Sequence, residues 1–286
     1  MPSTASSSSP SLALHPLPRR PSAIDLVNAR RKQSVARSQE DLKEFDRLQR
    51  QHYLLKSVRK SNLWAPITPG SVVVDVGSGN GVWAFDMANQ FSHLQIIGLD
   101  IQPPLEQQGT PKNLSYLEAD IHQTWPLADN SVDLIFQRNM GPIIHKHQWS
   151  HVFNEMFRVL KPGGYIELLE SDLWHHNPGP VLQEFDKYFR DYCTELEFDF
   201  AFTESLGSQI QDHGFKAIEQ REIDIPQFGF INKETQKAFL RNKKSFYLSK
   251  WEITSEEYDT AVQQVLEEFE EYHGFQRFHC WIARKP

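Results

Sequence analysis

The sequence predicts an α/β fold in which helices cover both faces of a mostly parallel β-sheet. The first observation is an apolar run with one embedded acid, Val72–Val76, that leads directly into a Gly-x-Gly-x-Gly turn at residues 77–81. The second is another apolar run, at residues 94–99, that ends in an acid, Asp100. The third is a helix end, a Pro-Gly-Gly break and a further strand within residues 159–169. Apolar strands of this kind are typical of the centre of a parallel sheet covered by helices.

The turn after the first strand has the glycines that a bound nucleotide requires. Gly77 and Gly79 let the backbone turn sharply and approach a ligand closely, because neither residue has a Cβ atom. Asp100, at the end of the second strand, is placed to accept hydrogen bonds from both hydroxyls of a ribose. Together the turn and the acid predict a site for an adenosine-containing cofactor.

Two details of the turn separate the candidate cofactors. The third glycine is Gly81, one residue earlier than in the Gly-x-Gly-x-x-Gly pattern of dinucleotide sites, where Val82 would have to be the glycine. Asp75, two residues before Gly77, would repel a phosphate but suits a ligand with an ammonium group. The turn therefore favours S-adenosylmethionine, which carries an α-ammonium and a sulfonium, over a nicotinamide dinucleotide. A nicotinamide oxidoreductase stays as the disfavoured alternative.

The remaining elements follow from apolar periodicity and from breaks at glycine and proline. A third strand, at residues 114–121, contains Asp120, whose carboxylate is placed to accept from an adenine amino group. Residues 102–113 hold three prolines and a glycine, so we expect the usual helix between the second and third strands to be short or absent. Further strands are expected at residues 131–136, 165–169, 216–225 and 277–283, and helices at residues 40–63, 181–196, 203–213, 232–250 and 255–273.

Five further features complete a pattern that spans about residues 45–175. They are a tryptophan at the end of the glycine turn, a proline loop after the second strand, a tryptophan after the third acid, an arginine after the fourth strand and a Leu-Lys-Pro-Gly-Gly-Tyr-hydrophobic-Glu motif: Trp83, Pro103, Trp125, Arg138 and residues 160–167. With them the chain resembles a class I S-adenosylmethionine-dependent methyltransferase, and more nearly the fungal LaeA-like subgroup. The resemblance implies a Rossmann-like class I methyltransferase fold: a seven-stranded mixed sheet with an antiparallel edge hairpin and helices on both faces.

The resemblance also implies a role for each residue of the cofactor site. The acid before the glycine turn and the turn itself would hold the methionine end, and the acids after the second and third strands would hold the ribose and the adenine. The residues after the fourth strand would line the channel to the sulfonium. The expected cofactor-binding set is Asp75, Gly77, Ser78, Gly79, Asp100, Ile101, Asp120, Ile121, Gln137 and Arg138.

We expect the chain to have two parts. Residues 1–39 are rich in serine, proline and basic residues, which predicts a disordered leader, and residues 40–286 form the methyltransferase domain. Within the domain, the helix at residues 40–63 either closes over the cofactor as a lid, as the resemblance implies, or only covers the sheet. Residues 226–275 are expected to be a helical insertion that covers the substrate. Phosphorylation of the leader and a mitochondrial transit peptide stay open as alternatives.

The candidates for catalysis are histidines in a loop after the fifth strand. Methyl transfer from a sulfonium is an in-line displacement, so the protein must mainly orient the two reactants. A general base is needed only when the acceptor carries a proton, and His175 or His176 is placed to take it. The alternative for each is an ordinary hydrogen-bonded loop histidine. No histidine spacing matches a standard zinc pattern, so no metal is expected.

Charge and composition exclude several classes of partner. The formal net charge is −7, and residues 1–39 hold six basic residues against one acid, so the remainder carries −12. An acidic body does not suit a nucleic-acid substrate, and no apolar run approaches membrane length, so we expect neither partner. Cys193 and Cys280, in a chain without a secretory signal, indicate a reducing compartment. We expect the cytoplasm, with the nucleus and the mitochondrion as alternatives.

The function predicted from the sequence is methyl transfer from S-adenosylmethionine to a small molecule. The resemblance places that acceptor in fungal secondary metabolism. One alternative is a LaeA-like regulatory methyltransferase that acts on proteins. Another is a non-catalytic regulator that keeps the cofactor fold and works by binding protein partners.

Overall fold

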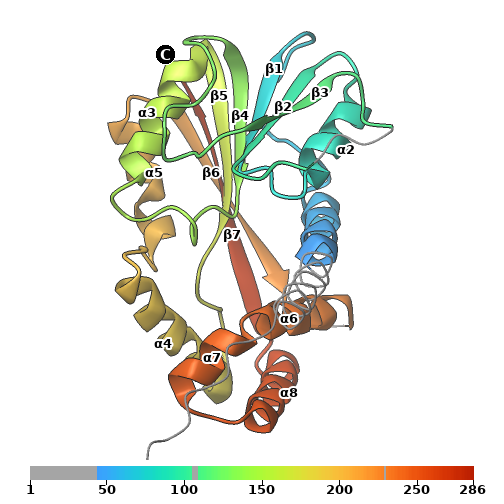
Figure 1. Ribbon diagram of the computed structural model, residues 1–286, viewed down its shortest axis with the longest axis vertical. Coiled ribbons are helices and arrows are strands. Elements are labelled where there is room, and N and C mark those ends of the chain that lie inside the picture. The colour runs from blue at the N-terminus through green and yellow to red at the C-terminus, as the bar shows by residue number, and fades with distance from the viewer. Residues whose placement is uncertain (1–43, 105–108, 229) are drawn as a thin grey trace, which may run out of the picture. The chain divides into compact units, whose positions relative to one another are not determined.

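The computed structural model describes residues 44–104, 109–228 and 230–286. The predicted leader lies outside the described residues. Seven strands form one sheet in the order β3-β2-β1-β4-β5-β7-β6, which runs through the middle of the ribbon diagram (Figure 1). The strands are β1 Val72–Val76, β2 Gln95–Asp100, β3 Leu114–Glu118, β4 Val132–Arg138, β5 Leu160–Ser171, β6 Lys216–Pro226 and β7 Phe275–Arg284.

The pairing of the strands confirms the predicted mixed sheet. The strands from β3 to β5 are parallel to their neighbours, and β7 pairs antiparallel with β5 on one side and with β6 on the other. The hairpin of β6 and β7 is the predicted antiparallel edge. The sequence predicted no strand from Lys161 to Gly164, but β5 includes this segment with an irregularity in its register against β4. Gly163 adopts a φ of 84°, which a glycine tolerates without strain.

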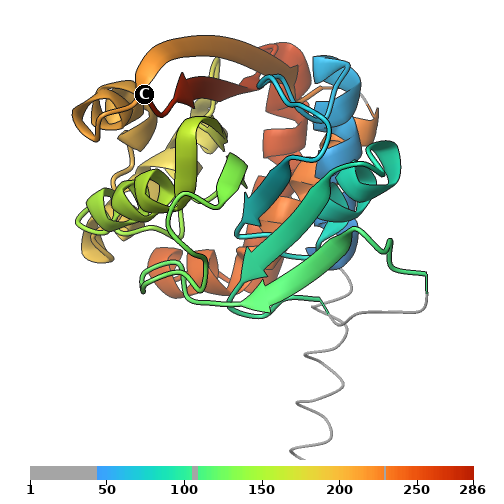
Figure 2. The same cartoon turned by 90° about the horizontal axis from the view of Figure 1, so that it is seen from above.

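Helices cover both faces of the sheet, as predicted, and each face has its own apolar cluster (Figure 2). On one face, α3 (Trp149–Val159) and α5 (Phe202–Asp212) pack against residues such as Val74 and Val76. On the other face, α2 (Val82–Gln90) and a helix at residues 44–59 pack against residues such as Val73. Successive residues of a strand point to opposite faces, so the apolar residues of β1 supply both clusters.

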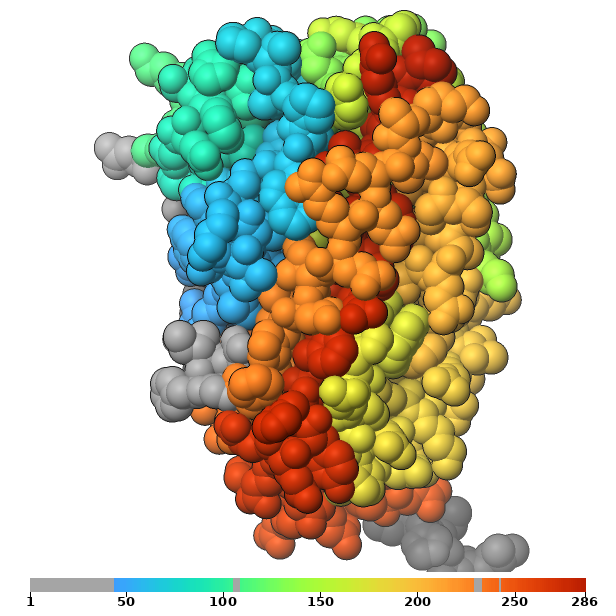
Figure 3. Space-filling model, turned by 180° about the vertical axis from the view of Figure 1, so that it is seen from behind, coloured from blue at the N-terminus to red at the C-terminus, as the bar shows by residue number. Residues whose placement is uncertain are grey.

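The helix at residues 44–59 is the described part of the predicted helix at residues 40–63. In Figure 3 this segment lies beside the segment of β6 and the residues that follow it. The contacts agree, because Leu55 and Leu63 share an apolar cluster with Ile223 and Ile225 of β6. The guanidinium of Arg221 also lies 4.8 Å from the ring centroid of Trp64.

A third apolar cluster lies among four helices at the lower end of Figure 1. The helices are α4 Pro180–Glu195, α6 Phe230–Asn242, α7 Lys244–Trp251 and α8 Ser255–Glu271. The sequence predicted one helix over residues 232–250, and this is wrong, because the chain forms α6 and α7 with a break at Lys243. The N–H of Lys243 donates to the carbonyls of both Phe239 and Leu240, which tightens the last turn of α6. A capping box formed by Thr254 and Glu257 begins α8.

Two further observations concern absent helices. Between β2 and β3, no helix is found in the described residues 101–104 and 109–113, as the prolines predicted. No helix among the described residues is both long and apolar enough to cross a membrane.

Candidate active site

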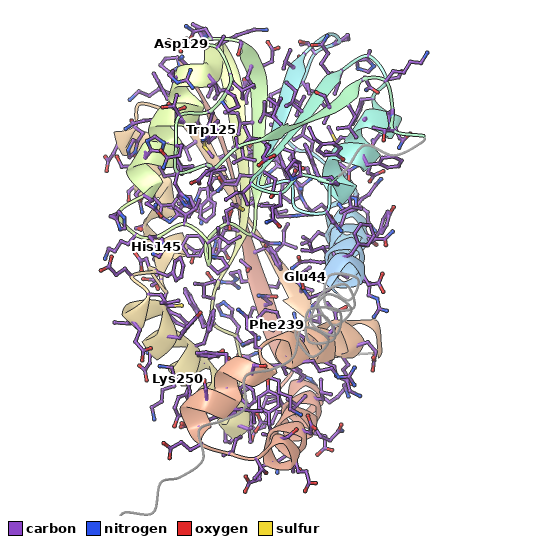
Figure 4. All side chains as sticks on the ribbon, in the orientation of Figure 1. Glu44, Trp125, Asp129, His145, Phe239 and Lys250 are labelled. Carbon is purple, nitrogen blue, oxygen red and sulfur yellow. The ribbon has the colours of Figure 1, made fainter. Side chains whose placement is uncertain are left out.

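A cavity of about 680 Å³ lies at the carboxyl ends of the parallel strands. Its floor is built from residues that directly follow β1, β2, β3, β4 and β5, which is where α/β sheets bind ligands. The helix at residues 44–59 forms one wall, and α4, α6 and α7 form another. Figure 4 labels one lining residue from each of two walls, Glu44 and Phe239. The cavity is lined by members of all three apolar clusters.

The glycine turn shapes the cavity where β1 ends. Gly77 has a φ of 68°, and a Cβ atom at this position would lie 2.3 Å from the sulfur of Met140. Gly79 has a φ of 54°, and the nearest atom to its missing Cβ is Cδ1 of Leu48, at 3.7 Å. The first glycine is therefore required by packing as well as by its φ, whereas the second leaves space open beside the cavity.

Asp75 is the least satisfied polar group of the site. Its side chain lines the cavity yet is only 4% exposed, and its Oδ2 atom has no hydrogen-bond partner among the described residues. Burial raises the pKa of this carboxyl group to about 7, against the opposing charge of Arg138. The hydroxyl of Ser78 is also buried without a partner in the described part of the chain. A buried acceptor without a donor suits a cationic, hydrogen-bonding group of a ligand.

The acids after β2 and β3, Asp100 and Asp120, both line the cavity. Oδ2 of Asp100 accepts from the N–H of Gly79 at 2.8 Å, and Oδ1 accepts from the N–H of Gln102 at 2.9 Å. These bonds fix the carboxylate against the glycine turn and leave further lone pairs on each oxygen. Oδ1 of Asp120 accepts from the N–H of His122 at 2.9 Å. The neighbours Ile101 and Ile121 also line the cavity.

The structure separates Gln137 from Arg138, which the sequence had grouped together. Consecutive strand residues face opposite sides of a sheet, so only Arg138 of this pair lines the cavity. The amide of Gln137 is fully buried on the other face, where it donates to Glu170 at 3.2 Å. Burial lowers the pKa of Arg138 to about 10, despite the nearby carboxylates of Asp75 and Glu170.

A chain of polar contacts connects Arg138 to the helix at residues 44–59. Arg138 donates to Nδ1 of His52 at 3.4 Å, and Nε2 of His52 donates to Asp86 of α2 at 2.9 Å. Burial and the charge of Arg138 lower the pKa of His52 to about 4, so this histidine is neutral. Lys56, on the same helix, also donates to Asp86 at 2.6 Å. The covering helix is thus tied to two elements that bound the cavity.

The two candidate catalytic histidines have different surroundings. His175 lines the cavity, and its Nδ1 and its backbone N–H both contact the carboxylate of Asp186 on α4, at 2.7 and 2.8 Å. This pairing directs Nε2 away from Asp186, and no described residue hydrogen-bonds to Nε2. His176 is not among the residues that line the cavity, and it stacks on Phe275 with ring centroids 4.8 Å apart. Its Nε2 contacts Asp172 at 2.7 Å.

Several residues of the cavity wall gave no signal in the sequence. Asp186 follows His175 by eleven residues on another element, so no local motif connects them. Met140 and Arg47 reach the cavity only because a loop and a covering helix fold back over the sheet. Trp125, which belongs to the family pattern, is buried and does not line the cavity, but its indole donates to the carbonyl of the lining residue Ile121 (Figure 4). Among the described residues, no group of three acidic, histidine or cysteine side chains is placed to hold a metal ion.

Comparison with known proteins identifies the class. A family described as "Methyltransferase domain" matches residues 73–164, which include the glycine turn and four of the parallel strands. In a solved structure, phosphoethanolamine N-methyltransferase 2 of Haemonchus contortus in complex with S-adenosyl-L-methionine, the same fold superposes with a TM-score of 0.51 at 21% identity. The match covers 82% of this chain and about half, 51%, of that one. The chain has the fold of the class I methyltransferases, and its sequence is similar to theirs over residues 73–164.

In sequence the chain is similar to fungal LaeA proteins and to a fungal N-methyltransferase. The secondary metabolism regulator laeA of Aspergillus niger is 24% identical over 86% of this chain and 71% of the relative. The protein-methionine methyltransferase laeA of Emericella nidulans shows the same identity and coverage. The N-methyltransferase gliN of Aspergillus fumigatus is 22% identical over 85% of this chain and 94% of the relative.

Proposed function

We propose that this protein binds S-adenosylmethionine and transfers its methyl group to a small molecule of fungal secondary metabolism. The observation that carries the proposal is the unpartnered, buried oxygen of Asp75 in the cavity wall beside the glycine turn. An α-ammonium supplies the donors that this oxygen lacks. A dinucleotide would instead bring phosphate to a carboxylate, and the two would repel each other.

The other residues of the floor complete the cofactor site. Asp100, already oriented by Gly79 and Gln102, has lone pairs left for the ribose hydroxyls. Ile101 and Ile121 offer apolar contacts, and Asp120 an acceptor for the adenine amino group. S-adenosylmethionine supplies an activated methyl group when it is bound. The contribution of the protein is then to hold the acceptor in line and to exclude water, which is worth about 7–11 kcal/mol at best.

His175 is the residue that we propose as the general base. The carboxylate of Asp186 holds its Nδ1 side, so Nε2 is left to accept a proton from an acceptor in the cavity. Proton transfer by a positioned histidine contributes roughly 10²- to 10⁴-fold to the rate. His176 has the supporting role of holding the loop, because its ring is already engaged by Asp172 and Phe275.

Calorimetric titration with S-adenosylhomocysteine tests the cofactor site. We expect Asp100→Ala to weaken binding at least about 100-fold, because two charge-assisted hydrogen bonds to the ribose are lost. Gly79→Arg fills the open space beside the turn and should abolish binding. Asp129→Ala is the control, because Asp129 is exposed and lies at the end of the sheet opposite the cavity (Figure 4). Failure of the folded wild-type protein to bind would refute the proposal.

The second candidate function is methylation of a protein, which the name of the Emericella nidulans relative favours. Incubation with methyl-labelled S-adenosylmethionine and a fungal extract divided by mass distinguishes the two acceptor classes. Label in the low-mass fraction supports a small molecule, and label confined to the protein fraction supports the alternative. No label in either fraction, from a protein that binds the cofactor, supports a regulator that acts through protein partners.

We further propose that the protein works in a reducing compartment, with the cytoplasm as the first choice. Cys193 and Cys280 are both buried and unpaired. Unpaired buried cysteines are usual where thiols are kept reduced. Detection of the protein in the nucleus or mitochondria of fractionated cells would move this assignment to one of the alternatives.

A further inference from the structure

A lysine lies in the part of the cavity that the cofactor site does not use. Lys243 occupies the break between α6 and α7, and its side chain lines the cavity. Its ammonium lies 5.4 Å from the ring centroid of Phe189 on α4 and 6.0 Å from that of Phe239 on α6. The break in the helix thus places a cation between two aromatic walls.

Lys243 forms no ion pair with the residues that the structure describes, although the carboxylate of Glu44 and the thiol of Cys193 are near enough to favour its charged form. Arg47, another cation of the cavity lining, is paired with the carboxylate of Glu44 at 2.6 and 2.8 Å. The guanidinium of Arg138 is stabilised electrostatically by the carboxylates of Asp75 and Glu170. Lys243 has no carboxylate within ion-pair distance among the described residues, and burial lowers its pKa below the ordinary value. A partly buried cation without a counter-ion is stabilised by an anionic ligand.

The positions of Lys243 and of the proposed base, His175, indicate how far an anionic ligand would extend through the cavity. Phe189, beside the lysine, and Asp186, which holds His175, are three residues apart on α4, and both line the cavity. Residues three apart on a helix are neighbours on one face. The lysine and the histidine therefore line the same cavity, together with two further aromatic residues, Phe185 and Tyr247, whose ring centroids lie 4.8 Å apart.

We propose that Lys243 binds an acidic group of a planar, aromatic acceptor, such as a carboxylate or a phenolate, and so selects the substrate. The inference rests on the proposed function, because it assigns the acceptor end of the same cavity. The aromatic side chains pack against the rings of the acceptor, and the ammonium of Lys243 binds its acidic group. Together they orient the acceptor so that the atom to be methylated lies near His175. The competing explanation is that cation–π contacts alone satisfy Lys243, which would give it only a packing role.

The test compares two fluorescent probes that differ in one charge. 8-Anilinonaphthalene-1-sulfonate is an anionic aromatic, and N-phenyl-1-naphthylamine has the same rings without the sulfonate. Each is titrated into the full chain with and without saturating S-adenosylhomocysteine, for the wild type, Lys243→Met and Lys243→Arg. Lys250→Met is the matched control, because this lysine lies on α7, the helix that begins directly after Lys243, and pairs with Glu195 outside the cavity (Figure 4).

We expect Lys243→Met to weaken binding of the sulfonate probe about tenfold or more while it leaves the neutral probe unchanged. Lys243→Arg should retain the preference for the anion, and Lys250→Met should behave as the wild type. Equal effects of Lys243→Met on both probes, or none on the sulfonate, would overturn the inference, as would a wild type that binds neither probe. The titration without S-adenosylhomocysteine reports on Lys243 even if the cofactor proposal fails.

Discussion

Asp75 shows how one buried carboxylate makes the affinity for a ligand depend on pH. Its pKa of about 7 means that the free protein holds a proton on this group in acid solution. An ammonium is attracted to the ionised carboxylate and gains much less from the neutral acid. Binding of a cationic ligand below pH 7 must therefore release the proton, and the free energy of that release weakens the affinity.

We predict that the dissociation constant of S-adenosylhomocysteine rises as the pH falls below 7, by up to about tenfold per pH unit. Asp75→Asn should bind weakly with little dependence on pH. The titratable groups that interact electrostatically with Asp75 are Arg138, Asp100 and Tyr116. Glu170, with a pKa also near 7, lies on the opposite face of the sheet. Glu170→Gln should keep the pH dependence. A flat profile for the wild type between pH 5 and 8 would contradict the prediction.

For individual residues, the sequence predicted the local geometry of the glycine turn better than the contacts of His175. Asp75, Gly77 and Gly79 lie within five positions of one another, so one local sequence motif is enough to identify all three. His175 was selected for its place after a strand, but its partner Asp186 comes from a different element. The contact between His175 and Asp186 depends on how α4 packs over the loop. This packing cannot be inferred from the spacing of the two residues in the sequence.

At the scale of elements, the helix at residues 44–59 is fixed by buried charge as well as by apolar packing. At its end Arg59 forms an ion pair with Glu167, which is fully buried in β5. The other oxygen of Glu167 accepts from the N–H groups of Trp64 and Ala65, at 2.8 and 2.6 Å. One carboxylate thereby holds both the helix end and the segment that leads toward β1.

We predict that Glu167→Gln destabilises the folded protein by about 3–5 kcal/mol, because it leaves the guanidinium of Arg59 buried without a counter-charge. Urea denaturation followed by circular dichroism measures the loss. Asp224→Asn is the matched control, because its pair with Arg277 is exposed and should be worth at most about 1 kcal/mol. Equal effects of the two substitutions would show that the buried pair has no special role.

Element boundaries were predicted well where the periodicity was strong and poorly where a helix changed direction. The strand and turn from β1 onward, and the helices α4, α5 and α8, lie close to their predicted residues. The break at Lys243 was missed, because residues 232–250 contain neither proline nor glycine. It arises from packing among α6, α7 and α8, which is a tertiary effect that overrides helix propensity.

At the scale of the whole molecule, the cavity lies where three apolar clusters meet. Leu55 and Met140 come from the clusters on the two sheet faces, and Tyr247 comes from the helical cluster. A ligand in this cavity contacts all three at once. Binding should therefore stabilise the fold as one unit and not only the glycine turn.

We predict that S-adenosylhomocysteine at 100 times its dissociation constant raises the free energy of unfolding by about 2.7 kcal/mol. The gain is measured as a shift of the urea midpoint with an unchanged slope. Hydrogen exchange should slow in residues 44–59 as well as around the glycine turn. Protection confined to the turn would show that the helix does not respond to the cofactor, and Asp100→Ala should remove the entire effect.

The segment between Pro226 of β6 and Phe275 of β7 leaves the sheet and returns to it at neighbouring positions. Pro226 of β6 pairs with Phe275 of β7, and the N–H of Gln227 donates to the carbonyl of Gly274 at 2.9 Å, so both ends of the segment are held side by side. During evolution such a segment can change independently of the sheet. It can be lengthened, shortened or exchanged between paralogues without moving a strand, and one ancestral cofactor scaffold can thereby acquire many acceptors.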